Sequence, residues 1–310
     1  MSENPQKKNT GFLMQGSILA MAGILVRLIG LVYRIPMVNI IGTKGNGYYT
    51  SAYSVYSLFL ILSSYSFPAA ISKIISERLA EGRFRDIKNV IRYSFVLAFF
   101  VGLIMFSIMF FGSDFISLIL RKPFLRFALQ ALSPTLFIMA FLSILRGVFQ
   151  GMGNMIPTAI SQVFEQIANA IASIVFAYVL FSRGQIANLI YESEEYSYAF
   201  GARGGAVGTG VGAFTALIIL MFMFKKLARK YKGFLDSNNY YEPESRNRIY
   251  GVLLATMVPI ILSSTIYNLT SVIDDIIFSN TLTIMKSDLN IVVLWGVFGN
   301  YHYFLIYQLL

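Results

Sequence analysis

Two arginines lie inside the first long apolar segment of the chain. Arg27 and Arg34 interrupt residues 11–41, which are otherwise mainly Leu, Ile, Val, Met and Gly. They are seven residues apart, about two turns of an α-helix, so their side chains share one face. An arginine in hydrocarbon costs on the order of 3 kcal/mol or more, so that face is unsuited to lipid. Because a guanidinium binds phosphate through paired hydrogen bonds, the spacing indicates a hydrated, positively charged cavity for an anionic cargo.

These arginines could also have a structural role. Arg34 is close to the outer end of its segment and could extend to the membrane interface, and either arginine could pair with an intramembrane carboxylate. Lys73, which follows Pro68 in the next apolar segment, could hold phosphate or reach an interface in the same way. We predict that Arg27, Arg34 and Lys73 bind the anionic cargo and that Pro68 kinks its helix.

A polar stripe interrupts the apolar segment at residues 157–181. Its members are three and four residues apart and share a helix face: Gln162, Glu165, Asn169 and Ser173. An ionisable group inside a membrane is costly and is usually functional. Glu165 is therefore a candidate site for a coupling proton or cation, with a structural ion pair to an arginine as the alternative.

A similar polar run precedes two adjacent carboxylates in the segment at residues 249–278. Ser264, Asn268 and Ser271 lead to Asp274 and Asp275. Two neighbouring carboxylates could coordinate a cation or accept a proton, and we predict them as further ion-coupling residues. The alternative is that they mark a helix end that faces water.

Three tyrosines recur at helical spacing near the start of the second apolar segment, at Tyr49, Tyr53 and Tyr56. Tyrosine is enriched at membrane interfaces because its ring is apolar and its hydroxyl is polar. We expect these residues in an interfacial aromatic belt rather than in a surface on which a sugar stacks.

Glycines repeat every four residues in the stretch GARGGAVGTGVGA (201–213), at Gly204, Gly208 and Gly212. The stretch has neither a preceding strand nor a GK[ST] ending, so it is not typical of a nucleotide-binding loop. The repeat predicts close helix packing through small residues.

The composition indicates a multi-span helical membrane protein. Hydrophobic residues make up 56% of the 310 residues and charged residues only 13%, against roughly 25% charged residues in soluble domains. There is no cysteine, and the single histidine is His302, which excludes disulfides and histidine-rich metal sites. We predict no metal and no cofactor. The net charge of +10 reflects basic loops rather than a nucleic-acid partner.

Seven apolar segments are long enough to cross a bilayer, which takes roughly 20 residues. They lie at about 12–40, 48–75, 90–112, 126–150, 157–181, 204–224 and 249–278, and an eighth begins near residue 300. The loops at 77–89 and 225–248 are basic and the loop at 182–203 is acidic, which predicts a cytoplasmic N-terminus by the positive-inside rule. One basic cluster falls on the predicted outer side, against this rule: Arg121, Lys122 and Arg126.

Three stretches carry a family resemblance. They are RLIGLVYRIPMVNIIGTKGNGYYTSAYSVYSLFLILSSYSFPAAISKIISE (27–77), LRGVFQGMGNMIPTAISQVFEQI (145–167) and SSTIYNLTSVIDDIIFSN (263–280). In this order and spacing they resemble the multidrug/oligosaccharidyl-lipid/polysaccharide exporter superfamily. Within it they are most similar to the polysaccharide-biosynthesis and stage V sporulation protein B-like group, which is related to lipid II flippases. The resemblance covers nearly the whole chain.

The resemblance implies an all-α, polytopic membrane bundle of about fourteen helices in two lobes, around a cavity that opens alternately to each side. On that basis the chain divides into a cytoplasmic tail (1–11), a first six-helix lobe (12–224), a basic inter-lobe loop (225–248) and the start of a second lobe (249–310). The last residues, HYFLIYQLL, stop inside the incipient eighth span. We therefore expect a truncated form of a longer polypeptide.

The resemblance also suggests a cargo and roles for individual residues. Arg27 and Arg34 match first-span arginines of the flippase branch, Glu165 lies in the matching EQ element, and Asp274 lies at the matching position of span seven. The turn motif, for which we expect a role as gate or lobe hinge, comprises Arg146, Gly147, Gln150, Gly151, Asn154 and Pro157. The implied cargo is a polyprenyl-pyrophosphate-linked sugar precursor such as lipid II.

The function expected from this resemblance is a flippase rather than an enzyme. It would move envelope precursors from the inner to the outer leaflet of the bacterial cytoplasmic membrane, in contact with membrane lipids and with envelope-synthesis proteins. One alternative is a cation-coupled multidrug exporter of the same superfamily, whose cavity should hold more carboxylates than arginines. A membrane glycosyltransferase or a non-transporting envelope-assembly protein is another, although no sizeable extramembrane loop that could hold a catalytic carboxylate is visible.

Overall fold

The computed structural model describes residues 5–235, 242–284 and 292–297, and the regular elements within these ranges are helices. In chain order they are α1 (Pro5–Leu60), the π-helix η1 (Ile61–Tyr65), α2 (Phe67–Ala80), α3 (Phe84–Phe111), α4 (Ser113–Ile119), the 3-10 helix η2 (Pro123–Leu125), α5 (Arg126–Gly151), α6 (Ile156–Tyr191), α7 (Glu195–Leu235) and α8 (Arg246–Ile284). Residues 292–297 are also helical. Within the described ranges, six segments are long and apolar enough to cross a membrane, and the first of them, Met14–Ala80, contains a hairpin. The chain is thus an all-α polytopic bundle, as predicted. The predicted eighth span lies outside the described residues.

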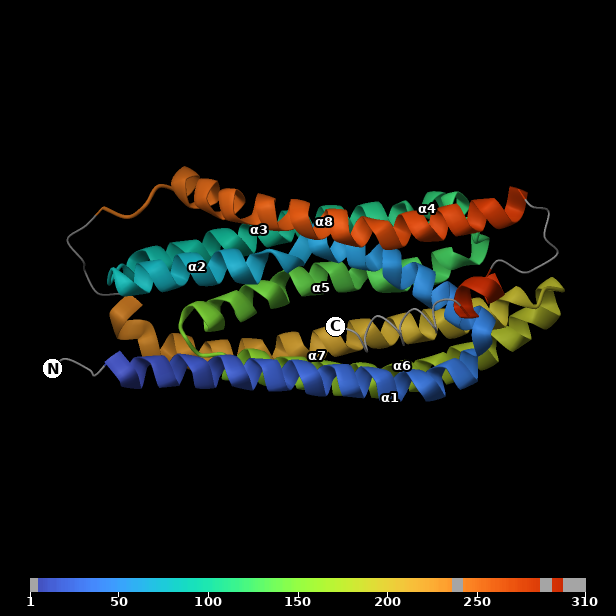
Figure 1. Cartoon of the computed structure of the whole chain (residues 1–310), viewed down its shortest axis with the longest axis horizontal. Coiled ribbons are helices and arrows are strands. Elements are labelled where there is room, and N and C mark those ends of the chain that lie inside the picture. The colour runs from blue at the N-terminus through green and yellow to red at the C-terminus, as the bar shows by residue number, and fades with distance from the viewer. Residues whose placement is uncertain (1–4, 236–241, 285–291, 298–310) are drawn as a thin grey trace.

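A sharp reversal at Gly42 divides α1 into two arms. Gly42 has φ 68° and ψ 174°, a conformation open to glycine because it has no Cβ. The first arm (residues 14–41) runs along the bundle to the corner, and the second arm (residues 43–60) returns in the opposite direction (Figure 1). The predicted first span is the first arm, whereas the predicted second span (48–75) begins in the second arm and continues through η1 into α2. The glycine-rich link between the two predicted spans is a tight corner.

The corner of the hairpin is fastened to the start of α7. Lys44 Nζ lies 2.5 Å from Glu195 Oε1, and the Tyr48 hydroxyl donates a 2.7 Å hydrogen bond to Glu195 Oε2. One carboxylate therefore holds two side chains of the second arm, which fixes where this arm leaves the corner.

The helix break predicted at Pro68 comes slightly earlier in the chain. The π-helical turn η1 ends at Tyr65, and α2 starts at Phe67 with Pro68 in its first turn. Proline is tolerated there because the first backbone N–H groups of a helix have no intrahelical partner. The π-turn and the proline together separate α2 from the second arm.

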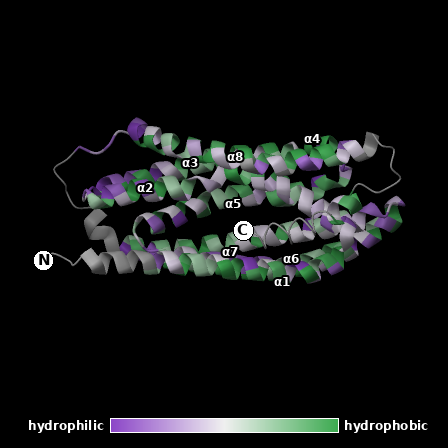
Figure 2. Cartoon of the chain, viewed as in Figure 1, coloured by the Kyte–Doolittle hydropathy of each residue, from purple (hydrophilic) through white to green (hydrophobic). Residues whose placement is uncertain are grey.

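The predicted loops are shorter in the structure than in the sequence interpretation. The predicted acidic loop at 182–203 shrinks to residues 192–194, because α6 runs to Tyr191 and α7 begins at Glu195. Much of the predicted loop at 77–89 likewise belongs to α2 and α3. The loops were predicted from polar side chains, which show where a segment leaves the hydrocarbon of the membrane. A helix is defined by its backbone hydrogen bonds, and these can continue beyond that point into water. Figure 2 shows this pattern, with apolar residues along the middle of the bundle and hydrophilic residues gathered at its ends.

The helices form two layers. The first arm lies beside α6 and α7, the second arm lies with α2, α3 and α8, and α5 runs between the layers (Figure 1). The closest packing is between α6 and α7, where a Cβ at Gly212 would come 2.6 Å from the Glu165 carbonyl oxygen. Gly204 and Gly208 likewise lie against the backbone of α6 at Phe176 and Ser173. The prediction of close packing through these glycines is confirmed.

The turn between α2 and α3 and the start of α8 lie at the same end of the bundle as the start of α1, and the acidic turn before α7 lies at the opposite end (Figure 1). The prediction of a cytoplasmic N-terminus is compatible with this arrangement and stays a prediction.

A charge cluster joins the two basic loops. Glu244, just before α8, accepts ion pairs from Arg78 Nη2 at 2.8 Å and Arg83 Nη1 at 3.2 Å. Its backbone N–H donates a 2.9 Å hydrogen bond to Asp86 Oδ1, and Asp86 Oδ2 lies 2.7 Å from Arg83 Nη2. Burial alone would lower the pKa of Arg83, but the attraction of Asp86 and Glu244 raises it above its ordinary value. The cluster therefore fixes the start of α8 on the α2–α3 turn.

Candidate functional site

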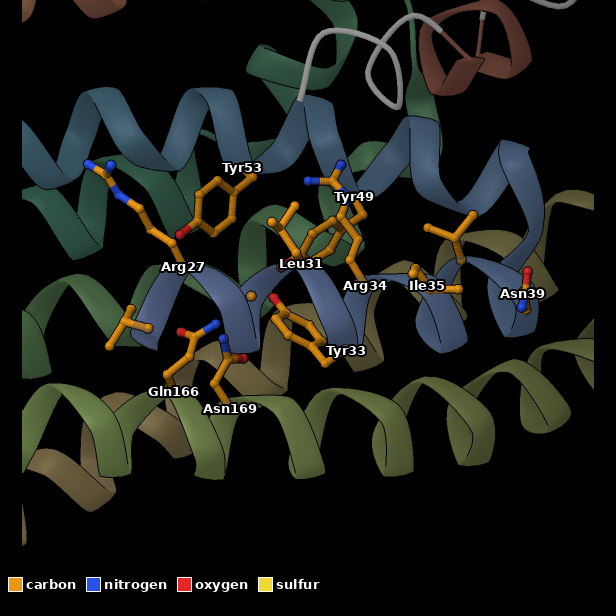
Figure 3. Close-up of a pocket in the computed structure, with 13 residues that line it drawn as sticks. Arg27, Leu31, Tyr33, Arg34, Ile35, Asn39, Tyr49, Tyr53, Gln166 and Asn169 are labelled. Carbon is orange, nitrogen blue, oxygen red and sulfur yellow. The ribbon is translucent and has the colours of Figure 1, made fainter. Parts of the chain in front are cut away.

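A cavity of about 450 Å³ opens between the two arms of α1 and helix α6. The first arm contributes most of the lining, the second arm adds two tyrosines, and α6 adds two amides. The lining residues are Val26, Arg27, Gly30, Leu31, Tyr33, Arg34, Ile35, Val38, Asn39, Tyr49, Tyr53, Gln166 and Asn169. Figure 3 shows the side chains of this cavity, which we call the arginine cavity.

Both arginines predicted from the sequence line the arginine cavity, one at each side of Tyr53 (Figure 3). Arg27 is exposed and forms no ion pair with any residue of the described part of the chain. Arg34 is half-buried, with its Nε and Nη2 atoms shielded from solvent. The lining contains no Asp or Glu, so the two arginines give it a net positive charge.

A second, smaller cavity of about 290 Å³ adjoins the first and shares Val26, Arg27 and Gln166 with it. Glu165 lies here, and its Oε2 is 2.5 Å from Arg146 Nη2. The Nε and Nη2 atoms of Arg146 are also each 3.3 Å from Ser161 Oγ. Since Arg146 already balances the charge of Glu165, this carboxylate does not reduce the positive charge that Arg27 brings to both cavities.

The turn motif after α5 makes a close-packed joint. A Cβ at Gly147 would come 2.9 Å from Ile71 Cβ, and one at Gly151 would come 2.8 Å from Ile75 Cβ, so both glycines let α5 lie directly against α2. The role of this motif as a gate or hinge stays a prediction.

The chain then reverses into α6 through residues 152–155. Gly153 adopts φ 73°, the backbone N–H of Gly153 donates a 2.9 Å hydrogen bond to the Gln150 carbonyl, and the N–H of Asn154 donates at 3.0 Å to Phe149. Pro157 stands in the first turn of α6, where its missing N–H removes no intrahelical bond.

Asp275 and its neighbour Asp274 have different environments. Asp275 is 1% exposed, and its Oδ1 lies 2.5 Å from the Nζ of Lys122, which is fully buried. Lys122 Nζ also donates a 2.7 Å hydrogen bond to Ser51 Oγ and sits 4.9 Å from the ring centroid of Trp295. Asp274 is exposed. The basic cluster that opposed the positive-inside rule is therefore partly explained, because Lys122 is neutralised by a carboxylate of α8.

Two further sequence expectations concern Lys73 and the tyrosines. Lys73 is exposed on α2 and lines neither cavity, so the structure does not bring it to the two arginines. The expectation of an interfacial belt is wrong: Tyr49 and Tyr56 are only 4% and 2% exposed, and Tyr53 is partly buried. The reversal at Gly42 turns these rings inward, toward the first arm and the core.

Sequence reasoning missed several polar residues of the arginine cavity, namely Tyr33, Asn39 and Gln166. Asn39 lies twelve residues after Arg27 in the same apolar segment, and Gln166 directly follows Glu165. Nearness in sequence to residues that had already been selected was the available indication of a role for them.

Within the described ranges no group of three His, Cys, Asp or Glu side chains could hold a metal ion.

The bundle, its internal polar cavities and its membrane-length helices define a polytopic helical membrane protein. The family comparison names the group: residues 12–283 match the polysaccharide biosynthesis protein family, and the chain belongs to it. This family places the chain in the multidrug/oligosaccharidyl-lipid/polysaccharide exporter superfamily.

Relatives from Bacillus subtilis (strain 168) support this assignment. The chain is 29% identical to stage V sporulation protein B over 276 residues. This aligned region covers 88% of this chain and 50% of the relative. It is 27% identical to the lipid II flippase MurJ over 208 residues. This aligned region covers 63% of this chain and 38% of the relative. The chain thus spans half or less of the length of these relatives.

Two solved structures share the fold. One is an inward-facing multidrug-resistance MATE family transporter of the MOP superfamily, with a TM-score of 0.59 and 16% identity over 88% of this chain and 59% of that chain. The other is a MOP superfamily transporter from Pyrococcus furiosus, with a TM-score of 0.61 and 18% identity over 90% of this chain and 61% of that chain. The bundle therefore has the fold of part of a MOP transporter, about 60% of the chain of each neighbour.

Proposed function

We propose that this chain forms the cargo-binding first lobe of a flippase for lipid-linked saccharides. The cargo is a polyprenyl-pyrophosphate-linked sugar, and the protein moves it from the inner to the outer leaflet of the bacterial cytoplasmic membrane. One observation carries the proposal: a cavity inside a membrane bundle has two arginines and no acidic residue in its lining. A pyrophosphate is the group that such a cavity suits, because guanidinium and phosphate form charge-assisted, paired hydrogen bonds.

Residue roles follow from this assignment. Arg27 is exposed in both cavities and meets the pyrophosphate first, while Arg34 holds it from the deeper position. Rocking of two lobes then carries the site between the two sides of the membrane. The joint between α5 and α2 at Gly147 and Gly151 is a candidate pivot, since it packs backbone directly against backbone.

Coupling to an ion is part of the same proposal. Glu165 and Asp275 each hold a basic partner at 2.5 Å. Protonation or cation binding at either carboxylate would release that partner and change a helix contact. Asp274, exposed beside Asp275, completes the set of candidate coupling residues.

The competing function is export of cationic drugs in exchange for a cation. Its cargo would be repelled by a lining that contains arginines and no carboxylate. Glu165, the nearest acid, is already neutralised by Arg146. The electrostatics of the cavity therefore favour an anion.

Binding tests the proposal directly and does not require a second lobe. The purified 310-residue chain, in lipid nanodiscs, is titrated with undecaprenyl pyrophosphate, undecaprenyl phosphate and undecaprenol. Affinity should fall in that order. Arg27→Gln should weaken pyrophosphate binding by roughly tenfold to a hundredfold, because one hydrogen bond to a charged group is worth about 1.5–3 kcal/mol.

The matched control is Arg203→Gln, since Arg203 is an exposed arginine of α7 that lines neither cavity. This variant should bind undecaprenyl pyrophosphate as the wild type does. Equal affinity for the three lipids, or equal losses in the two variants, would overturn the proposal. Binding of a lipophilic cation instead would favour drug export.

A further inference from the structure

The arginine cavity has a neutral polar wall that a pyrophosphate does not explain. Besides the two arginines it is lined by the phenol rings of Tyr33 and Tyr53 and by three side-chain amides. A volume of about 450 Å³ is within the range of small-molecule sites, about 300–1,000 Å³, and leaves room for a group next to the pyrophosphate. The chemistry of that wall indicates what this neighbouring group is.

The first component of the wall is a tyrosine ring that its neighbours hold in place. Tyr53 packs between Tyr49, with ring centroids 5.9 Å apart, and Tyr56, with centroids 5.5 Å apart. Tyr49 and Tyr56 are buried, whereas Tyr53 is only partly buried and reaches the cavity. The ring of Tyr53 is therefore a preformed surface. Ordering it on binding costs little, since its two neighbours already restrict it.

The second component is a pair of amides on α6. Gln166 and Asn169 are three residues apart, so they share a face, and Figure 3 shows both beside Tyr33. Ser173 Oγ lies 2.9 Å from Asn169 Oδ1 and orients that amide. A Cβ at Gly30 would come 3.2 Å from Gln166 Nε2, so the glycine leaves the space that the glutamine amide occupies.

These components fit a pyranose ring. A sugar ring has apolar C–H faces, which pack on an aromatic ring, and polar hydroxyl or acetamido groups at its edge. An amide both donates and accepts hydrogen bonds, so Gln166 and Asn169 can pair with either group. In Figure 3 the ring of Tyr53 lies between Arg27 and Arg34 along the cavity, so a sugar bonded directly to a pyrophosphate would reach it.

We propose that Tyr33, Tyr53, Gln166 and Asn169 form a saccharide subsite beside the arginines. This inference rests on the proposed function and deepens it: the cavity recognises the first sugar after the pyrophosphate as well as the pyrophosphate itself. The cargo class is then a lipid pyrophosphate that carries a neutral hydroxyl- or acetamido-bearing pyranose. Gly30 acts as a specificity determinant because it leaves room for the Gln166 amide.

The test compares two ligands of equal charge, in which the terminal phosphate carries either a sugar or a methyl ester. Undecaprenyl-pyrophosphoryl-N-acetylglucosamine and the terminal methyl ester of undecaprenyl pyrophosphate are titrated into the purified chain in nanodiscs. The wild type should bind the sugar-bearing lipid about tenfold more tightly, which is the effect of roughly one good hydrogen bond and one ring contact. Gln166→Leu and Tyr53→Leu should each reduce this preference to about threefold, because each variant removes one of the two contacts. Tyr53→Phe, which keeps the ring, should retain most of the preference.

Control variants separate the subsite from the pyrophosphate site. Tyr178→Leu changes an exposed tyrosine of α6 that lines neither cavity and should preserve the preference for the sugar. Arg27→Gln should weaken the binding of both lipids by the same factor. If the wild type binds both lipids equally, the saccharide subsite is refuted while the proposed function stands. If the wild type binds neither lipid, the proposed function itself fails.

Discussion

The buried ion pair between Lys122 and Asp275 gives the sharpest prediction about stability. It joins the turn before α5 to α8 across 153 residues of sequence, with Nζ and Oδ1 2.5 Å apart. The two side chains are 0% and 1% exposed. Asp275→Asn keeps the shape of the side chain and removes its charge. The Lys122 ammonium is then left in the interior without its counter-charge, with neutral acceptors, the Ser51 hydroxyl and the oxygen of the new amide, in place of the carboxylate.

The size of the effect follows from burial. Breaking a buried pair by removing one partner costs about 3–5 kcal/mol, because the remaining charge stays desolvated and uncompensated. Removing both charges has a smaller cost, since the desolvation penalty is lost together with the attraction. The double variant Lys122→Met with Asp275→Leu should therefore recover most of the stability that Asp275→Asn loses.

Equilibrium unfolding in detergent micelles, followed by helical circular dichroism, measures these differences. The adjacent Asp274 is exposed, so Asp274→Asn is the matched control and should change the free energy of unfolding by about 0.5 kcal/mol or less. If Asp275→Asn is as mild as Asp274→Asn, the pair does not hold α8 and the reasoning is refuted. If the double variant is as unstable as Asp275→Asn, the loss comes from packing rather than from the unpaired charge.

Two further predictions concern packing and the charge cluster at the start of α8. Gly208→Ala should destabilise the bundle by about 1–3 kcal/mol in the same unfolding assay, because the new methyl group meets Ser173 of α6; Gly251→Ala, where the space is open, should be neutral or stabilising. Glu244→Gln should expose the start of α8 to limited proteolysis, since it removes the carboxylate that two arginines share, whereas Glu242→Gln, at an exposed position, should leave the cleavage rate unchanged. Unchanged cleavage in both variants would show that the cluster does not fasten this segment.

The sequence by itself determined the class of the protein and the apolar segments that can cross a membrane. Partition into a membrane depends on the hydropathy of about 20 consecutive residues, which is a local property of the chain. The same locality explains why the shared face of Arg27 and Arg34 could be predicted, since helical periodicity alone sets it. Close packing at the glycine repeat of α7 could be predicted for a similar reason, because small residues along one helix face let a neighbouring backbone approach closely.

Tertiary structure decided which charged groups meet and which rings face the cavity. The sequence offered Glu165 and Asp275 as candidate ion sites but did not show that Arg146 and Lys122 neutralise them, because pairing depends on how each helix is rotated and where the chain returns. It also did not decide between an interfacial belt and an inward position for Tyr53. An amphipathic ring suits both environments, and only the reversal at Gly42, which places the second arm across the cavity from the first, turned this tyrosine toward the arginines.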